Sequence, residues 1–86
     1  MVSKKVKVNI PTGIHLRPAG QLSETALKFK SKITIIKKND YINAKSLLSI
    51  LGACIKYGDE VEFICEGPDE MEALGEVIAV VQSEFE

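Results

Sequence analysis

The sequence predicts a two-layer α/β sandwich, in which helices cover one face of a mostly antiparallel four-stranded sheet and solvent meets the other face. Its 86 residues, 45% hydrophobic and 27% charged, suit one soluble domain (residues 1–86) with a single modest core. Hydrophobic periodicity gives the element order β-α-β-β-α-β-α. The predicted strands alternate apolar and polar residues, which is typical of antiparallel strands with one wet face.

The chain begins with a predicted strand and a predicted helix. Apolar and polar residues alternate from Lys5 to Ile10, which indicates a half-buried strand that ends at Pro11–Gly13. Helical spacing then continues to about Lys28. The apolar positions of this helix are Leu16, Ala19, Leu22, Ala26 and Phe29.

A hairpin is predicted next. The β-branched run over residues 33–36 favours a strand, and the turn signal Asn39-Asp40 returns the chain into a short partner strand over residues 41–44. The charged tip of this hairpin is expected to be solvated and to have no further role. Its residues are Lys37, Lys38 and Asp40.

A short helix follows the hairpin. Ser46 is placed to cap it and Gly52 to end it. So short a helix cannot turn all of its apolar residues inward, so some of them should be exposed. An exposed apolar patch more often marks a partner surface than an accident. The residues concerned are Leu47, Leu48, Ile50 and Leu51.

The last third of the chain predicts a strand and a helix. Val61, Phe63 and Cys65 alternate with Glu60, Glu62, Ile64 and Glu66 as a strand, and Gly67-Pro68 ends it. Asp69 and Glu72 resemble a capping box with aspartate as the cap. The helix that follows is expected to bury one continuous apolar stripe, made of Met71, Leu74, Ile78, Val81 and Phe85.

Several classes of protein are disfavoured by composition. A net charge of −1 predicts no general affinity for nucleic acid. No apolar run approaches the roughly 20 residues of a membrane span, and no signal-peptide core follows the N-terminus, which favours a cytoplasmic protein. Cys54 and Cys65 are expected to be reduced packing residues, because two cysteines at this spacing match no disulfide framework or metal motif. Neither a cofactor nor a metal site is predicted.

The segment from Gly13 to Ala19 carries the strongest functional signal. It holds the only histidine, His15, and the only arginine, Arg17, just before Pro18 at a predicted helix start. No capping side chain stands between residues 14 and 17, so backbone N–H groups should be open to an anion. Imidazole can be phosphorylated, and an arginine fork beside it would hold phosphoryl oxygens. The alternative is a surface histidine or one satisfied by a core hydrogen bond.

Two segments together resemble the HPr family, the histidine-containing phosphocarrier proteins of the sugar phosphotransferase system. Gly13–Ala19 is similar to the family's phosphohistidine signature, and Lys45–Leu51 to its second signature. The resemblance implies a four-stranded antiparallel sheet with three helices on one face. It also implies that His15 accepts a phosphoryl group from phosphorylated enzyme I and passes it to the IIA domain of a sugar permease. Arg17 would steady the phosphoryl oxygens.

The resemblance also implies a regulatory site and a docking surface. In one branch of the family HPr kinase/phosphorylase phosphorylates the serine that Ser46 matches, and the product binds a catabolite-control regulator. Ser46 could instead serve only as a helix cap, or it could be both a helix cap and a phosphorylation site. Leu16, Gly20, Leu47, Leu48 and Leu51 would surround His15 as a docking surface on a monomer, unless packing claims them.

Three other functions stay open. The chain could be a regulatory HPr-like protein that acts only through phosphorylated Ser46. It could be a small enzyme that uses His15 as nucleophile or base, although no Asp or Glu lies between Met1 and Ser23. It could also be a generic ligand-binding sandwich, which the absence of glycine-rich phosphate loops disfavours.

Overall fold

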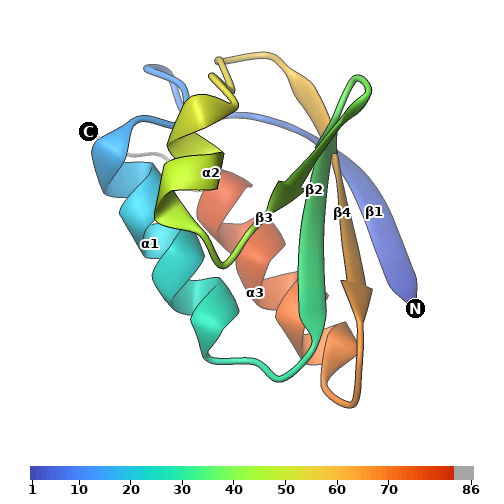
Figure 1. Ribbon diagram of the computed structural model, residues 1–86. Helices are drawn as coiled ribbons and strands as arrows, with labels where there is room; N and C mark the ends of the chain where they lie inside the picture. The colour runs from blue at the N-terminus through green and yellow to red at the C-terminus, as the bar shows by residue number, and fades with distance from the viewer. Residues whose placement is uncertain (83–86) are drawn as a thin grey trace.

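The computed structural model describes residues 1–82 and has the predicted element order (Figure 1). The strands and helices alternate as the hydrophobic periodicity indicates, with one helix after the first strand, one after the hairpin and one after the last strand. The elements are β1 (Val2–Lys7), α1 (Leu16–Leu27), β2 (Lys32–Lys37), β3 (Asp40–Asn43), α2 (Leu47–Gly52), β4 (Glu60–Glu66) and α3 (Glu70–Gln82).

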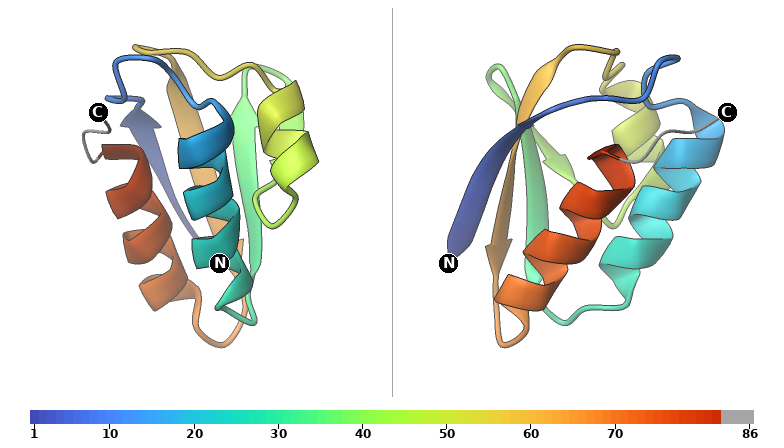
Figure 2. Two further views of the ribbon diagram at one scale, coloured as in Figure 1. Left: turned by 90° about the vertical axis from the view of Figure 1, so that its left-hand side faces the viewer. Right: turned by 180° about the vertical axis from the view of Figure 1, so that it is seen from behind.

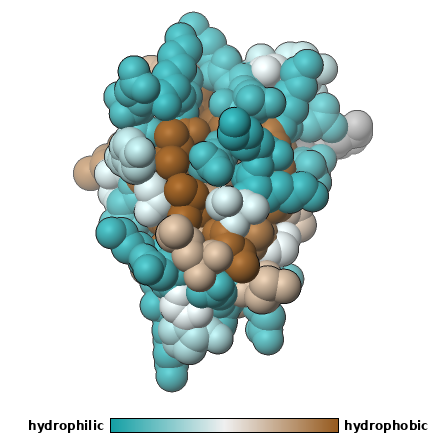
Figure 3. Space-filling view, turned by 90° about the vertical axis from the view of Figure 1, so that its right-hand side faces the viewer, coloured by the Kyte–Doolittle hydropathy of each residue, from teal (hydrophilic) through white to brown (hydrophobic). Residues whose placement is uncertain are grey.

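The strands form one sheet in the order β1-β4-β2-β3, and every neighbouring pair is antiparallel. All three helices lie on the same face of this sheet, as the two views of Figure 2 show. The other face is open, and Figure 3 shows it as largely hydrophilic around a narrow apolar strip. The half-buried Ile36 and Ile64 lie on this open side. The predicted open-faced α/β sandwich is therefore confirmed.

The core lies between the sheet and the helices. β4 alternates as predicted, with Val61, Phe63 and Cys65 buried toward the helices. Fully burying such apolar side chains contributes about 1.5–3 kcal/mol each. α1 turns Ala19, Leu22 and Ala26 into the same layer, also as predicted.

The predicted buried face of α3 is partly wrong. Met71 is 72% exposed and Leu74 is only half-buried, whereas Ala73 and Val77 are fully buried. The helix carries overlapping apolar stripes, and packing against α1 and the sheet decides which stripe is covered. Ile78 and Val81 are buried as expected, and Phe85 lies outside the described residues.

The first strand is shorter at its end than predicted, although its buried residues are correct. β1 ends at Lys7, yet Val8 and Ile10 are buried beyond it. Val8 donates from its backbone N to Asp59 O (2.8 Å) and accepts from Gly58 N (2.9 Å). The chain there pairs with the loop that precedes β4, so burial continues where the regular ladder stops. β3 begins at Asp40, one residue earlier than predicted.

The predicted capping box at Asp69 and Glu72 is also wrong. The Asp69 carboxylate instead accepts hydrogen bonds from the backbone N of Lys30 and Ser31 (2.9 Å each) and from the Ser31 hydroxyl. The Ser31 hydroxyl and the Lys30 amide lower the pKa of Asp69 to about 2. Glu70, not Glu72, reaches back three residues, and accepts from Gly67 N (3.1 Å). Asp69 therefore ties the start of α3 to the loop between α1 and β2.

Candidate functional site

The turn before His15 is pinned to the segment that follows α2. Gly13 has a φ of +75°, and a Cβ there would stand 2.9 Å from Ile55 O and 3.1 Å from Lys56 Cα. Ile14 donates from its backbone N to the same Ile55 O (2.9 Å). Only glycine combines this conformation with so close an approach of two backbones. The residue before His15 is thus held in place by the segment that follows α2.

His15 is the N-cap residue of α1. Its backbone is extended (φ −99°, ψ −163°), its carbonyl accepts from Ala19 N (2.9 Å), and its side chain makes no capping hydrogen bond. The imidazole is exposed, while Pro18 in the first turn is buried. The predicted helix start without a capping side chain is confirmed. The first-turn amides and the positive end of the helix dipole therefore lie beside an accessible ring.

Arg17 lies two residues after His15, in the first turn of α1, and is also exposed. It lines a shallow hollow on the outer side of the helix together with Leu16, Gly20, Gln21, Glu24, Thr25 and Lys28. His15 and Arg17 are therefore both exposed at the start of α1, but His15 does not line the hollow that contains Arg17.

The predicted docking residues lie on α1 and α2, which pack together (Figure 2, left). Leu16 is 65% exposed and Leu48 is 81% exposed, while Leu47 and Leu51 are half-buried. Ile50 is fully buried, so this short helix turns one apolar residue inward and leaves others at the surface, as predicted. Gly20 is half-buried, and a Cβ there would meet nothing within 4 Å.

Ser46 is the N-cap of α2, as predicted. Its hydroxyl oxygen accepts a hydrogen bond from Ser49 N (3.2 Å), and the residue is half-exposed. α2 runs in the opposite direction to α1 (Figure 1), so the N-terminal end of α2, which Ser46 caps, lies away from the N-terminal end of α1, which His15 caps. The two sequence-predicted phosphorylation positions therefore lie on one helical layer but at different heights.

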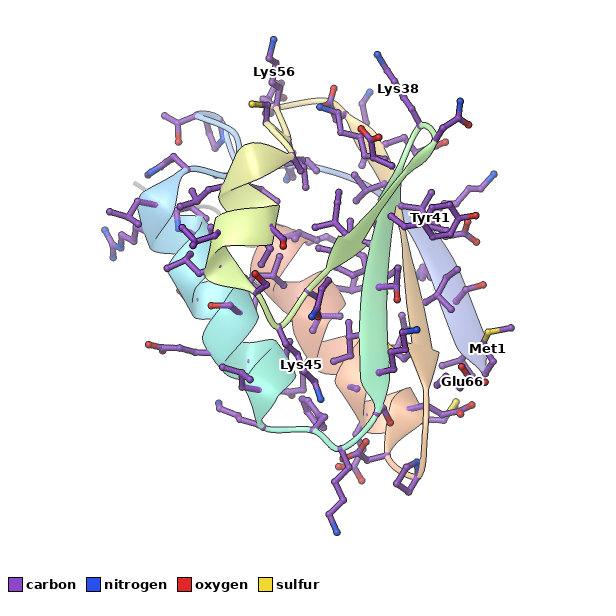
Figure 4. The ribbon with its side chains drawn as sticks, in the orientation of Figure 1. Met1, Lys38, Tyr41, Lys45, Lys56 and Glu66 are labelled. Carbon is purple, nitrogen blue, oxygen red and sulfur yellow. The ribbon has the colours of Figure 1, made fainter. Side chains whose placement is uncertain are left out.

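The predicted solvated hairpin tip is wrong for Lys37. Its side chain is 16% exposed, and Nζ donates to Ala53 O (3.1 Å) and Cys54 O (2.8 Å). The ammonium also lies 3.4 Å from Asp59 Oδ2. Lys38 is exposed, as expected, and projects into solvent in Figure 4. No sequence pattern signals this role for Lys37, because its partners are far along the chain.

The packing role predicted for the two cysteines holds for one of them. Cys65 is buried and burial raises the pKa of its thiol, whereas Cys54 is exposed. Cys54 has a φ of +51° and directly follows Ala53, the C-cap of α2. The left-handed residue that ends the helix is therefore Cys54, and Gly52 belongs to the helix itself. Both thiols are free.

Among residues 1–82, no group of three or more His, Cys, Asp or Glu side chains is placed to hold a metal ion. Within that same range, no helix is both long enough and apolar enough to cross a bilayer.

Known proteins resemble the chain over nearly its whole length. The family model described as "PTS HPr component phosphorylation site" matches residues 2–83. The phosphocarrier protein HPr of Treponema pallidum is 37% identical over 86 residues, which cover 100% of this chain and 98% of that protein. The HPr-like protein Crh of Bacillus subtilis is 38% identical over 84 residues, with coverages of 98% and 99%.

A comparison with solved structures also finds HPr proteins. The crystal structure of HPr from Thermoanaerobacter tengcongensis matches with a TM-score of 0.92 and 35% identity, over 96% of this chain and 93% of that one. The sequence similarity, the shared fold and an exposed histidine at the start of α1 agree with one another. The chain belongs to the HPr family of the sugar phosphotransferase system.

Proposed function

We propose that this chain is a phosphocarrier, in which His15 accepts a phosphoryl group from phosphorylated enzyme I and delivers it to the IIA domain of a sugar permease. The observation that carries this proposal is the exposed His15 at the start of α1, with no capping side chain and with Arg17 in the first turn. The HPr family membership supports it.

The transfer needs little from the protein beyond position and charge. A ring nitrogen of His15 attacks phosphorus with its lone pair while the bond from phosphorus to the donor nitrogen breaks. The other ring nitrogen keeps its proton, and the reverse sequence passes the group on. In this proposal, Arg17 and the first-turn amides would donate hydrogen bonds to the phosphoryl oxygens. The chain is thus a carrier that is modified and restored, and the enzymes are its partners.

The predicted docking surface on α1 and α2 suits short-lived complexes. Leu16 and Leu48 are exposed apolar residues on it, and Leu47, Leu51 and Gly20 are half-buried. One small patch that serves a donor and an acceptor in turn must release each quickly, which favours weak association. We propose that the protein is cytoplasmic, in keeping with its membership of the HPr family, and that it acts as a monomer. Solved dimers of Thermoanaerobacter tengcongensis HPr and of Crh make the oligomeric state worth measuring.

A reconstituted relay tests the carrier function. The reaction contains enzyme I, phosphoenolpyruvate, a IIA domain in large excess and a small amount of this protein. A carrier turns over, so phosphorylated IIA should far exceed the amount of this protein, and none should form when the protein is omitted. The proposal would be contradicted if the IIA domain stayed unphosphorylated with this protein but became phosphorylated when another HPr took its place.

A second function is favoured by Ser46 and by the Crh relatives. We propose that HPr kinase/phosphorylase phosphorylates Ser46 and that the product binds a catabolite-control regulator. The Crh of Bacillus subtilis is 38% identical and is described in one solved structure as catabolite repression HPr. A phosphate at this helix start is electrostatically tolerated, so the signal would be added charge beside the exposed Leu48.

The Ser46 site is tested with HPr kinase/phosphorylase and ATP. The expected result is one added phosphoryl group on the wild type and on Ser49→Ala, and none on Ser46→Ala. Ser49 is the matched control because it is an exposed serine on the same helix. Ser46→Ala should also lower the free energy of unfolding by about 1 kcal/mol, through loss of the cap. Phosphorylation that persists in Ser46→Ala would place the site elsewhere.

A further inference from the structure

We propose that Lys37 is a positioning residue for the phosphorylation of His15, acting through the segment between α2 and β4. This inference rests on the proposed carrier function. Lys37 is the last residue of β2, at the hairpin end, and it does not belong to the docking surface or to the first turn of α1. Its effect must therefore pass through other residues.

The first link is a pair of hydrogen bonds from Lys37 to the end of α2. Its ammonium donates to the carbonyl oxygens of Ala53 (3.1 Å) and Cys54 (2.8 Å). These are carbonyl groups at a helix C-terminus, where a cation is favoured. The side chain is 16% exposed, so water competes only partly for these hydrogen bonds. The left-handed Cys54, with a φ of +51°, is thereby held in a conformation that side chains rarely adopt.

The second link is Asp59, which closes the segment from its other end. Asp59 Oδ2 lies 3.4 Å from Lys37 Nζ and accepts from Lys56 N (2.9 Å). The Lys56 amide and the Lys37 ammonium both lower the pKa of Asp59, against the opposing effect of burial. The carboxylate therefore stays ionised at neutral pH. Lys37 and Asp59 together fix the backbone on both sides of Ile55.

The third link joins this segment to the histidine. Ile55 O accepts from Ile14 N (2.9 Å), and the Gly13 backbone lies against Ile55 and Lys56. Ile14 immediately precedes His15. A shift of the segment would thus move the N-cap residue of α1 and its ring relative to Arg17. Small displacements of a reacting group are costly, since about 1 Å can lower a rate 100-fold.

Three variants test the proposal in phosphoryl transfer from phosphorylated enzyme I. Lys37→Met should lower kcat about tenfold with KM within about twofold of wild type, because the geometry changes and the docking surface does not. Lys37→Arg should recover most of the rate, since its fork can reach the same carbonyl groups. Lys32→Met is the control, because it removes one exposed lysine from the other end of β2.

A second measurement keeps the test sharp if Lys37→Met is poorly folded. Asp59→Asn weakens the same contacts that Lys37 and Asp59 make with the segment between α2 and β4. In this variant the Ile14 amide hydrogen should exchange with solvent about tenfold faster than in wild type, through local opening and without global unfolding. A wild type that takes up no phosphate refutes the carrier function itself. Normal uptake with an unchanged kcat in Lys37→Met and Asp59→Asn, or with a raised KM alone, overturns the role of Lys37.

Discussion

Replacing Arg17 with alanine is expected to slow phosphoryl uptake from phosphorylated enzyme I about 100-fold, the effect of removing one oriented donor to a charge in transfer. The guanidinium is exposed in the first turn of α1, two residues after His15. Arg17→Lys should lose about tenfold, because a lysine keeps the charge without the two-pronged fork. Rapid-quench measurement of the phosphorylated protein gives these rates directly.

Lys28→Ala is the matched control for Arg17. Lys28 is a second basic residue that lines the same hollow, but it lies beyond the last turn of α1, far along the helix from His15. Its replacement should change the uptake rate less than about twofold, as expected of a distant surface charge. If Arg17→Ala and Lys28→Ala behaved alike, Arg17 would have no specific role in holding the phosphoryl group.

Replacing Gly13 with alanine is expected to lower the free energy of unfolding by about 3 kcal/mol, because a left-handed backbone and a steric clash add. The φ of +75° is unfavourable for alanine, and its Cβ would stand 2.9 Å from Ile55 O. Ile14 N donates a hydrogen bond to the same oxygen, so the two backbone segments cannot move apart without breaking it. Urea unfolding of the two proteins measures the difference.

Gly75→Ala is the control for this prediction. Gly75 is exposed within α3, and a Cβ there would meet nothing within 4 Å. Alanine is the better helix former, so this change should raise the free energy of unfolding by about 1 kcal/mol. A Gly13→Ala variant as stable as the wild type would show that the turn before His15 is not constrained by its neighbours.

The fold was predictable because each element carries its own local signal. Alternation in β4, helical spacing in α1 and the serine cap of α2 all agree with the structure. His15 at an uncapped helix start followed from the absence of capping residues beside it. These features depend on neighbours in the chain, and sequence reasoning sees such neighbours well.

The errors arise where a distant contact decides the outcome. The sequence pattern predicts that Asp69 caps its own helix, but its carboxylate accepts hydrogen bonds from Lys30 N and Ser31 N across the domain. A charged hairpin tip predicts that Lys37 is in solvent, but its ammonium donates to two carbonyl oxygens at the end of α2. Charged side chains choose partners in three dimensions, so periodicity alone could not place them.

The most direct test of the central claim is the intact mass of the protein after incubation with enzyme I and phosphoenolpyruvate. The prediction is a gain of one phosphoryl group that is labile to acid and to hydroxylamine, and that is absent from His15→Ala. No gain in the wild type, with an enzyme I that phosphorylates another HPr in parallel, would contradict the carrier function. The regulatory role of Ser46 would then become the leading explanation.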